Sequence, residues 1–358
     1  MAVAELETLI KDELDLMLDE TRGIGAMIVE EDVLITPSEL IKEVPLSDGV
    51  RKNVLRFRNE IREVLNGVDD RLMVITGPCS IDDSKAALEY ARRLKDFSEE
   101  YNDKILFVMR VYFEKPRTTV GWKGLLNDPE QDGSYNINNG LGITRRLLLD
   151  IAELGIPVAT EFLHPEVPYY IGDLISWAAI GARTTESQVH REFASGLAMP
   201  VCFKNSTSGD IRVAVDAVVS ARHQHSYPGI NEQGRIVNIK TNGNPDAHII
   251  LRGGSDGTNY DEGSVRNAIE LLSKAGVSEN LIIDCSHANS DKDYKKQLRV
   301  FEDVVNQRDN GNKNIVGVMV ESYLEDGRGN KYGQSKTDGC MGWKMTEDLI
   351  RAYFSLDN

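Results

Sequence analysis

Eight short apolar runs recur along this chain, and each ends in a residue that can take part in chemistry. The runs are LMVITGPC, ILFVMR, PVATE, WAAIGAR, PVCFK, HIILR, LIIDCSH and IVGVMVE, which end at Cys79, Arg110, Glu161, Arg183, Lys204, Arg252, His287 and Glu321. Apolar runs of about 4–8 residues rich in Val and Ile are typical of strands buried on both faces of a parallel sheet. Because most gaps between the runs carry a helix-like stretch, the pattern predicts an α/β fold, the (β/α)8 TIM barrel. Active sites of such barrels lie at the C-terminal ends of the strands.

The chain is longer than this barrel needs. From Leu72 to the last expected helix it spans roughly 285 residues, slightly more than the ~250 that are usual for the fold. We therefore expect residues 67–358 to form the barrel and residues 1–66 to form an N-terminal extension. The extension should contain an acidic amphipathic helix at 4–20, a short strand at 33–37 and a second helix at 48–65. Barrel helices are expected at 83–100, 139–153, 187–197, 210–222, 262–275, 291–307 and 343–355, whereas 165–176 is less clearly helical.

Two connections within the predicted barrel are unusually long. The loop at 114–136 is polar, basic at its start and interrupted by Gly and Pro. The stretch 224–247 is expected to form a β-hairpin insertion with Asn242-Gly243 as its turn, because Asn-Gly favours tight hairpin turns. Long loops on the top face of a barrel are usually binding loops or lids.

Charge and composition exclude several classes of protein. The net charge is -16, which argues against nucleic acid or anionic membranes as partners. No run approaches the ~18–20 apolar residues of a membrane span, and the acidic N-terminus is no targeting peptide, so a cytoplasmic protein is expected. The four cysteines, Cys79, Cys202, Cys285 and Cys340, are too few for a disulfide framework.

Basic residues are prominent among the predicted site residues, although acidic residues outnumber basic ones 57 to 41. The basic set consists of Arg110, Lys115, Arg117, Arg183, Lys204 and Arg252. Such side chains bind carboxylate and phosphate oxygens, so they predict a substrate with several anionic groups, or two anionic substrates. Any one of these residues alone would be read as an exposed ion-pair residue. Several together, most of them closing an apolar run, favour an anion-binding site.

A second set could bind a metal. Cys79, His287, Glu321 and Asp338 could converge from different strand ends on one divalent ion, and their mixed donors fit Mn, Fe(II), Zn or Co. The alternative is that Cys79 is a small buried apolar residue and His287 a hydrogen-bonded core residue. Spacing alone does not decide between these interpretations. Glu161 could handle a proton, orient a water or serve as a counter-charge to the basic set.

Long motifs along the chain resemble a known enzyme family. They are GPCSI (77–81), MRVYFEKPRTTVGWKGLLNDP (109–129), AIGARTTESQVHRE (179–192), FKN (203–205), HIILRGG (248–254), DCSHANS (284–290) and GVMVES (317–322). In this order they resemble class I 3-deoxy-D-arabino-heptulosonate 7-phosphate (DAHP) synthases of the feedback-regulated bacterial and fungal type. The resemblance covers the chain from about residue 30 onward. It implies a metal-dependent condensation of phosphoenolpyruvate with erythrose 4-phosphate, with release of phosphate, as the first step of the shikimate pathway to aromatic amino acids.

The resemblance also implies roles for individual residues. The metal ligands would be Cys79, His287, Glu321 and Asp338; phosphoenolpyruvate would be bound by Arg110, Lys115, Arg183, Lys204 and Arg252; and erythrose 4-phosphate would be bound by Arg117 and Thr118. Lys115 would protonate the developing alkoxide, while Glu161 and Lys204 would guide the attacking water. His287 joins the catalytic set as a metal ligand.

Partners beyond the substrates are implied as well. In the family the N-terminal extension supports oligomer contacts and closes a site for an aromatic amino acid, so a homo-oligomer, dimer or tetramer, is expected. The stretches HSYPGINEQG and NPDAHIILRGG favour tyrosine as the effector. Two other interpretations are a sister enzyme that condenses another aldose phosphate and an inactive barrel that serves as a regulatory subunit. The KPRTT segment favours the four-carbon sugar, and the intact set of chemical residues counts against an inactive barrel.

Overall fold

The computed structural model of the protein describes Ile28 and residues 30–354, so the helix expected at 4–20 lies outside the described residues. The chain divides into two compact units, Met1–Ile35 and Thr36–Asn358. The second unit contains the whole barrel together with the helix expected at 48–65. Among the described residues, none of the helices combines the length and apolar character that crossing a membrane requires.

A closed barrel of parallel strands forms the centre of the second unit, as the eight apolar runs predict. In chain order its strands are β1 (Leu72–Gly77), β2 (Ile105–Arg110), β3 (Val158–Glu161), β4 (Trp177–Ile180), β5 (Val201–Lys204), β8 (His248–Leu251), β9 (Leu281–Asp284) and β10 (Ile315–Glu321). Each strand pairs with its neighbours in the chain, and β10 pairs with β1 to close the ring. Every residue of these strands is buried, which explains why they appear in the sequence as continuous apolar runs.

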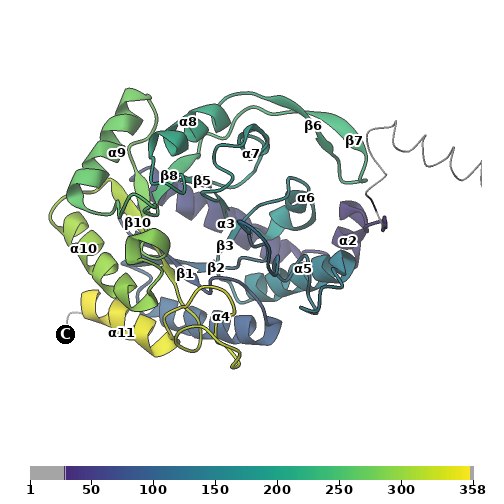
Figure 1. Cartoon of the computed structure of the whole chain (residues 1–358), viewed down its shortest axis with the longest axis horizontal. Helices are drawn as coiled ribbons and strands as arrows, with labels where there is room; N and C mark the ends of the chain where they lie inside the picture. The colour runs from purple at the N-terminus through teal and green to yellow at the C-terminus, as the bar shows by residue number, and fades with distance from the viewer. Residues whose placement is uncertain (1–27, 29, 355–358) are drawn as a thin grey trace, which may run out of the picture. The chain divides into compact units, whose positions relative to one another are not determined.

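Helices surround the barrel as an outer ring (Figure 1). They are α4 (Ser84–Glu99), α5 (Ile137–Glu153), α6 (Val167–Ile171), α7 (Gln188–Ala194), α8 (Arg212–Ala221), α9 (Glu262–Lys274), α10 (Gln297–Asp309) and α11 (Trp343–Tyr353). Short 3-10 turns occupy Gly172–Leu174, His287–Ser290 and Tyr294–Lys296. The barrel helices expected from the sequence are therefore present, and the stretch 165–176 is a short helix followed by a 3-10 turn.

Helix α3 (Asp48–Leu65) closes the N-terminal mouth of the barrel. Its apolar residues Ile61, Val64 and Leu65 belong to the same core cluster as strand residues from inside the barrel. Arg58 donates to the carbonyl of Ile175, just before β4, and Arg62 donates to the carbonyl of Ala198, just before β5. Since this end is closed, the C-terminal mouth is the end at which substrates can enter.

The prediction of a strand at 33–37 is wrong, because Pro37 begins helix α2 (Pro37–Glu43). Thr36 caps this helix: the Glu39 N–H donates to Thr36 Oγ1 (3.3 Å), and the Thr36 N–H donates to Glu39 Oε2 (2.9 Å). This reciprocal capping box, with proline in the first helical turn, outweighs the β propensity of the preceding Val and Ile.

The hairpin insertion is present, but its turn is not Asn242-Gly243. Strands β6 (Ser226–Ile230) and β7 (Ile236–Lys240) pair antiparallel, and the chain reverses at 231–235. Asn231 Oδ1 accepts from the N–H groups of Gln233 and Arg235 (both 3.0 Å), so an Asn side chain stabilises the turn. Gly243 instead lies where the returning chain meets helix α8, and a Cβ there would lie 2.1 Å from the Arg222 carbonyl oxygen.

Candidate active site at the C-terminal mouth of the barrel

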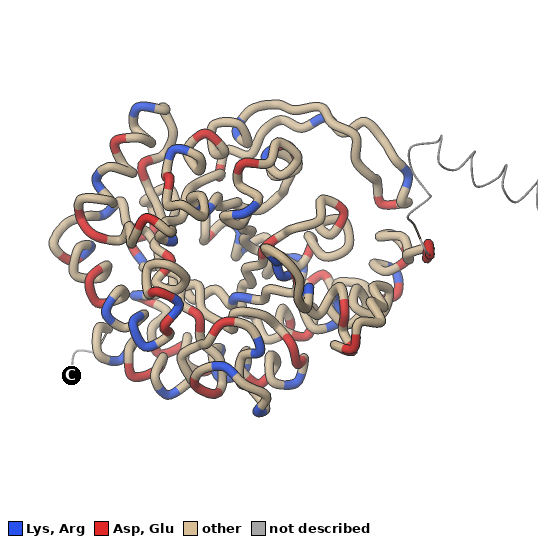
Figure 2. The backbone as a smooth tube through the Cα atoms, in the orientation of Figure 1, with Lys and Arg blue, Asp and Glu red and all other residues tan. Residues whose placement is uncertain are grey.

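One pocket at the C-terminal mouth gathers almost all of the site residues predicted from the sequence. Its volume is about 120 Å³. The predicted residues that line it are Cys79, Arg110, Lys115, Arg117, Glu161, Arg183, Lys204, Arg252, His287 and Asp338. The other two adjoin it: Glu321 accepts from Arg110 Nη2 (2.9 Å), and Thr118 Oγ1 accepts from Arg183 Nε (3.0 Å). Figure 2 shows basic residues inside the ring of helices as well as on its outer surface.

Arg110, the last residue of β2, is fully buried at the base of this pocket. Its guanidinium group donates to the carbonyl of Pro78 and to Glu321, and it lies 3.5 Å from the centre of the Tyr112 ring. Burial opposes the positive charge, but nearby negative groups, Glu321 among them, raise the pKa of Arg110. Arg110 therefore provides a buried positive charge, held in place by its partners, at the base of the pocket.

Asp284, the last residue of β9, links two of the predicted site residues and was missed by the sequence analysis. Its Oδ2 accepts from Lys204 Nζ (2.8 Å) and lies 2.8 Å from His287 Nδ1. Burial opposes ionisation of this carboxyl group, but His287 and Lys204 hold its pKa well below the usual range. An ionised Asp284 orients the His287 ring, so that Nε2 lies toward Glu321, 3.7 Å from its Oε1.

Three potential metal ligands lie close together beside Arg110. The Sγ of Cys79 and one carboxylate oxygen each of Glu321 and Asp338 all lie within 4.8 Å of one another. Burial raises the pKa of the Cys79 thiol, and Glu321 adds to the shift. A divalent cation would offset this by stabilising the thiolate, so the donor set fits a metal of the Mn, Fe, Co or Zn type. The fourth predicted ligand, His287, approaches this group through its contact with Glu321.

Lys115 contacts Cys79, one of these three potential ligands, directly. Its Nζ donates to the Cys79 carbonyl (2.8 Å) and lies 3.3 Å from Cys79 Sγ. The preceding residue, Glu114, is buried, accepts from the Leu163 N–H (3.1 Å) and pairs with His164 Nδ1. The hydrogen bond to Glu114 raises the pKa of His164. The loop that carries Lys115 is thus anchored to the loop after β3.

Glu161, the last residue of β3, is buried, and its Oε1 has no hydrogen-bond partner among the described residues. The carboxylate fits only because residue 181 is glycine: a Cβ there would lie 2.1 Å from Glu161 Oε1. Buried carboxylate oxygens normally have partners, so this oxygen is available to a substrate or a water.

The pocket also contains residues that the sequence analysis did not assign to it. They are Pro116, Gly181, Ala182, Thr207, Lys292 and Thr337. Lys292 lies 4.0 Å from Asp338 and adopts a left-handed backbone conformation (φ 59°), as do His287 and Asp291. Such conformations are unusual for residues other than glycine and cluster at functional sites. Nothing in the sequence marks them, because the backbone conformation is imposed by the tertiary structure.

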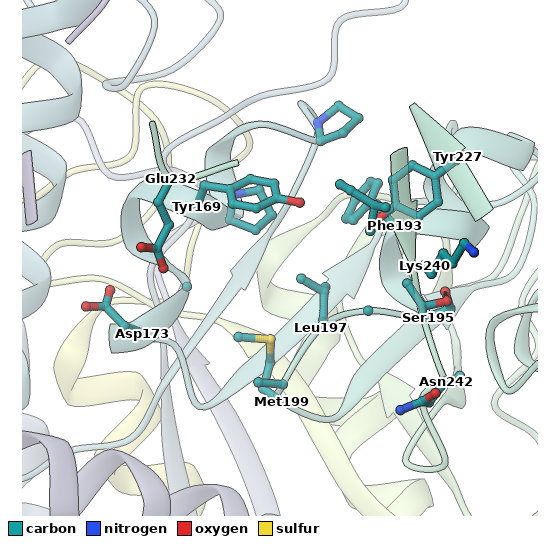
Figure 3. A pocket seen from close by; sticks show the side chains of 18 of the residues that line it. Tyr169, Asp173, Phe193, Ser195, Leu197, Met199, Tyr227, Glu232, Lys240 and Asn242 are labelled. Atoms are coloured by element: carbon teal, nitrogen blue, oxygen red, sulfur yellow. Dashed lines mark hydrogen bonds between the residues drawn. The ribbon is translucent and has the colours of Figure 1, made fainter. Parts of the chain in front are cut away.

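A second, larger pocket of about 640 Å³ lies away from this chemistry, between α6, α7 and the β6–β7 hairpin. Figure 3 shows Tyr169, Asp173 and Glu232 on one side, Phe193 and Tyr227 on the other, and Leu197 with Met199 between them. Arg58 also lines this pocket, and burial, aided by the charge of Arg62, lowers the pKa of Arg58 to about 10. The wall combines aromatic, apolar and charged groups.

At its C-terminal mouth this TIM barrel combines Arg and Lys side chains with a cluster of one thiol and two carboxylates. This combination is typical of metal-dependent enzymes that act on phosphorylated substrates. Comparisons with known proteins identify the family to which the chain belongs. Residues 43–351 match the DAHP synthetase I family. The chain belongs to this family.

Relatives and a solved structure agree with this membership. The Tyr-sensitive phospho-2-dehydro-3-deoxyheptonate aldolase of Escherichia coli is 49% identical over 332 residues, which cover 90% of this chain and 93% of that protein. The Phe-sensitive enzyme of the same organism is 51% identical over 331 residues, covering 90% and 94%. The phospho-2-dehydro-3-deoxyheptonate aldolase of Francisella tularensis superposes with a TM-score of 0.89 at 47% identity, covering 90% and 96%. The family resemblance expected from the sequence motifs and the barrel fold are both confirmed.

Proposed function

We infer that this chain is a 3-deoxy-7-phosphoheptulonate synthase, which condenses phosphoenolpyruvate with D-erythrose 4-phosphate and releases phosphate in the first step of the shikimate pathway. Family membership supplies the reaction. The observation that carries the assignment of the site is the pocket at the C-terminal mouth, where five basic side chains that can bind phosphoenolpyruvate lie beside the Cys79–Glu321–Asp338 cluster. Two anionic substrates account for this concentration of positive charge in an acidic protein.

Phosphoenolpyruvate is proposed to bind to Arg110, Lys115, Arg183, Lys204 and Arg252. Arg110 is rigid and buried, and Lys204 is held by Asp284, so both are suited to the carboxylate end of the substrate deep in the mouth. Erythrose 4-phosphate is proposed to bind to Arg117 and Thr118, which lie on the long loop after β2. The hydrogen bond from Arg183 to Thr118 joins the two substrate subsites. Holding both substrates lowers the entropic barrier to their reaction.

The proposed metal ligands are Cys79, His287, Glu321 and Asp338. When bound, the metal supplies Lewis acidity that polarises the aldehyde carbonyl of the sugar phosphate. C3 of phosphoenolpyruvate forms the new carbon–carbon bond to the aldehyde carbon, and Lys115 gives its proton to the former aldehyde oxygen. The position of Lys115 Nζ, 3.3 Å from Cys79 Sγ, supports this role.

The second half of the reaction needs a water at C2 of phosphoenolpyruvate. The free oxygen of Glu161 can accept a proton from this water, and Lys204 can help to orient it. Water adds to C2 and gives one proton to Glu161; the C–O bond to phosphate then breaks, the remaining hydroxyl becomes the ketone as its proton passes to the departing phosphate, and phosphate leaves. Lys115 and Glu161 line the same pocket, so both proposed proton-transfer groups can reach substrates bound there.

Turnover of the two substrates with and without a chelator tests this proposal. We expect phosphate release to stop when the metal is removed and to return when Mn²⁺, Fe²⁺, Co²⁺ or Zn²⁺ is added. Chelator-insensitive turnover would contradict the proposed site. Comparison of kcat/KM across a panel that includes arabinose 5-phosphate tests the four-carbon preference. A protein that binds metal but turns over neither substrate would be a regulatory barrel.

We further propose that an aromatic amino acid, tyrosine in the first instance, regulates the enzyme from the second pocket. The relatives are described as Tyr-, Phe- and Trp-sensitive. The pocket offers Phe193 and Tyr227 to an aromatic ring and Asp173 and Glu232 to an ammonium group. Inhibition should be measured with Phe, Tyr and Trp. Phe193→Ala should raise the effector concentration that halves the rate of the variant by about tenfold. Unchanged inhibition would exclude this pocket.

The family resemblance also supports a homo-oligomer, a dimer or a tetramer, with residues 1–66 contributing to its contacts. Sedimentation velocity of the full chain tests the oligomeric state, and comparison with a chain that begins at residue 36 tests the contribution of residues 1–35. The shorter chain retains the compact unit that contains the barrel. Identical sedimentation of the two chains as oligomers would remove residues 1–35 from the interface.

A further inference from the structure

Three buried asparagines connect the loops after three neighbouring strands. Asn205 follows β5, Asn259 lies in the loop after β8, and Asn289 lies in the 3-10 turn after β9; their exposures are 0%, 7% and 3%. Asn259 Nδ2 donates to Asn205 Oδ1 (3.1 Å), and the Asn259 N–H donates to Asn289 Oδ1 (2.9 Å). Strands β5, β8 and β9 are adjacent in the barrel, so this chain of hydrogen bonds spans three strand ends.

The three asparagines surround the backbone of Arg252 and Gly253. Asn205 Oδ1 accepts from the Arg252 N–H (2.8 Å), and Asn259 Oδ1 accepts from the Gly253 N–H (2.7 Å). The Gly253 carbonyl accepts from Asn205 Nδ2 (2.9 Å), and the Arg252 carbonyl accepts from the Asn289 N–H (3.3 Å). Every polar backbone atom of these two residues is therefore held by one of the asparagines.

Close packing at Gly253 adds to this constraint. Gly253 has a φ of +68°, and a Cβ at this position would lie 2.8 Å from the backbone of Ala288 and Asn289. The chain after β8 is thus pressed against the turn that carries His287, with no space for a side chain between them. The backbone of Arg252 is thus bonded to Asn205, the neighbour of Lys204, and to Ala288, the neighbour of His287.

The amide group is the chemical group that this network requires. Asn205 uses its full capacity: Oδ1 accepts two hydrogen bonds, and Nδ2 donates to the carbonyls of Ser206 and Gly253. Asn289 Nδ2 likewise donates to the carbonyls of Leu251 and Asp284. A carboxylate could not donate, and an apolar residue would leave buried backbone groups without partners. The three asparagines are absent from the described lining of the pocket, so they act through other residues.

We propose that Asn205, Asn259 and Asn289 are positioning residues that fix Arg252 relative to Lys204 and His287 for the binding of phosphoenolpyruvate. This inference rests on the proposed role of Arg252 in binding that substrate. Satisfied buried polar networks are rigid, and a displacement of about 1 Å in a binding group can cost a large factor in rate. The network therefore ties the backbone of Arg252 to the loops that carry Lys204 and His287.

The test is steady-state kinetics of the full-length, metal-loaded Asn259→Ala variant with each substrate varied in turn. Loss of this amide frees the Gly253 N–H and breaks the link between the two other asparagines. We expect the KM for phosphoenolpyruvate to rise at least about tenfold, while the KM for erythrose 4-phosphate changes by less than about twofold. If Asn259→Ala does not fold, Asn259→Ser, whose hydroxyl can still accept from Gly253, should give a smaller rise in the same constant.

Asn244→Ala is the matched control. Asn244 is 3% exposed and donates to the carbonyls of Leu197 and Met199 (3.2 and 3.0 Å), away from the barrel mouth. It should lower the unfolding temperature without raising the KM for phosphoenolpyruvate. Equal changes of both KM values in Asn259→Ala, or no change, would overturn the positioning role. Arg252→Lys separates the two proposals: if it leaves the KM for phosphoenolpyruvate unchanged, the substrate role of Arg252 itself is wrong.

Discussion

At the scale of single residues, two buried cysteines have different proposed roles, one in metal binding and one in packing. Cys79 belongs to the cluster with Glu321 and Asp338, whereas Cys202 lies in the barrel core with Trp177 and Ile250. Loss of even an outer partner of a metal ligand lowers affinity or activity by about 10–100-fold, so Cys79→Ala should lower kcat by at least about 100-fold. Cys202→Ala should keep the activity. Turnover and bound metal, measured on both variants, check this, and equal activity would remove Cys79 from the ligand set.

Gly181 offers a second test at this scale. Because a Cβ would lie 2.1 Å from Glu161 Oε1, Gly181→Ala must displace the carboxylate that is proposed to handle the water. We expect kcat/KM for phosphoenolpyruvate to fall by at least about tenfold with little loss of stability, since the displaced group is the end of a flexible side chain. Steady-state kinetics and thermal unfolding measure the two effects. Normal kinetics in a folded variant would argue against a catalytic role for Glu161.

Residues that carry charge at the end of a buried strand could be found from the sequence, because folding alone would favour apolar residues there. Arg110, Glu161 and Lys204 are of this kind. Asp284 is of the same kind, but the apolar run around it was read through to His287, so its place as the last residue of β9 was overlooked. The buried asparagines carry no such mark, since their role depends on hydrogen bonds between segments far apart in the sequence.

At the scale of the secondary-structure element, helix α5 contains two glycines with opposite environments. A Cβ on Gly140 would lie 2.0 Å from the Leu126 carbonyl oxygen, whereas a Cβ on Gly142 would meet nothing within 4 Å. Gly142→Ala should stabilise the protein by about 0.5–1 kcal/mol, because alanine has less backbone freedom to lose on folding. Gly140→Ala should destabilise it by about 1–3 kcal/mol, because backbone must move. Denaturant unfolding of the two variants measures the difference. Effects of the same sign would contradict this account.

Elements were predictable where one physical cause dominated. Burial on both faces made the parallel strands visible as apolar runs, and amphipathic periodicity located helices such as α3. Prediction failed where local hydrogen bonds decided the outcome. The capping box of Thr36 and Glu39 turned an expected strand into the start of a helix, and the Asn231 side chain, rather than Asn242-Gly243, formed the hairpin turn.

At the scale of the whole molecule, a closed parallel barrel converts distance along the chain into proximity at one mouth. Cys79 and Asp338 are more than 250 residues apart in the sequence, and the pairing of β10 with β1 brings their segments together. This is why the location of the candidate site could be predicted from the residues that end the eight apolar runs. Its detailed geometry, including the left-handed turn at His287, depends on packing that no pattern in the sequence records.

With the same geometry, a metal held by the proposed ligands would cross-link the first and last parts of the barrel. Of the proposed ligands, Cys79 follows β1, His287 follows β9, Glu321 is the last residue of β10, and Asp338 lies in the loop after β10. A ligand that binds only the folded state stabilises it, by about 2.7 kcal/mol at a concentration 100 times its dissociation constant. We therefore expect chelation to lower the unfolding temperature of the wild-type protein, as measured by calorimetry at fixed protein concentration. In Cys79→Ala the chelator should cause a much smaller shift, because binding is already weakened. A shift of the same size in both proteins would mean that the stabilising metal is bound elsewhere, and the cluster of Cys79, Glu321 and Asp338 would lose its proposed role.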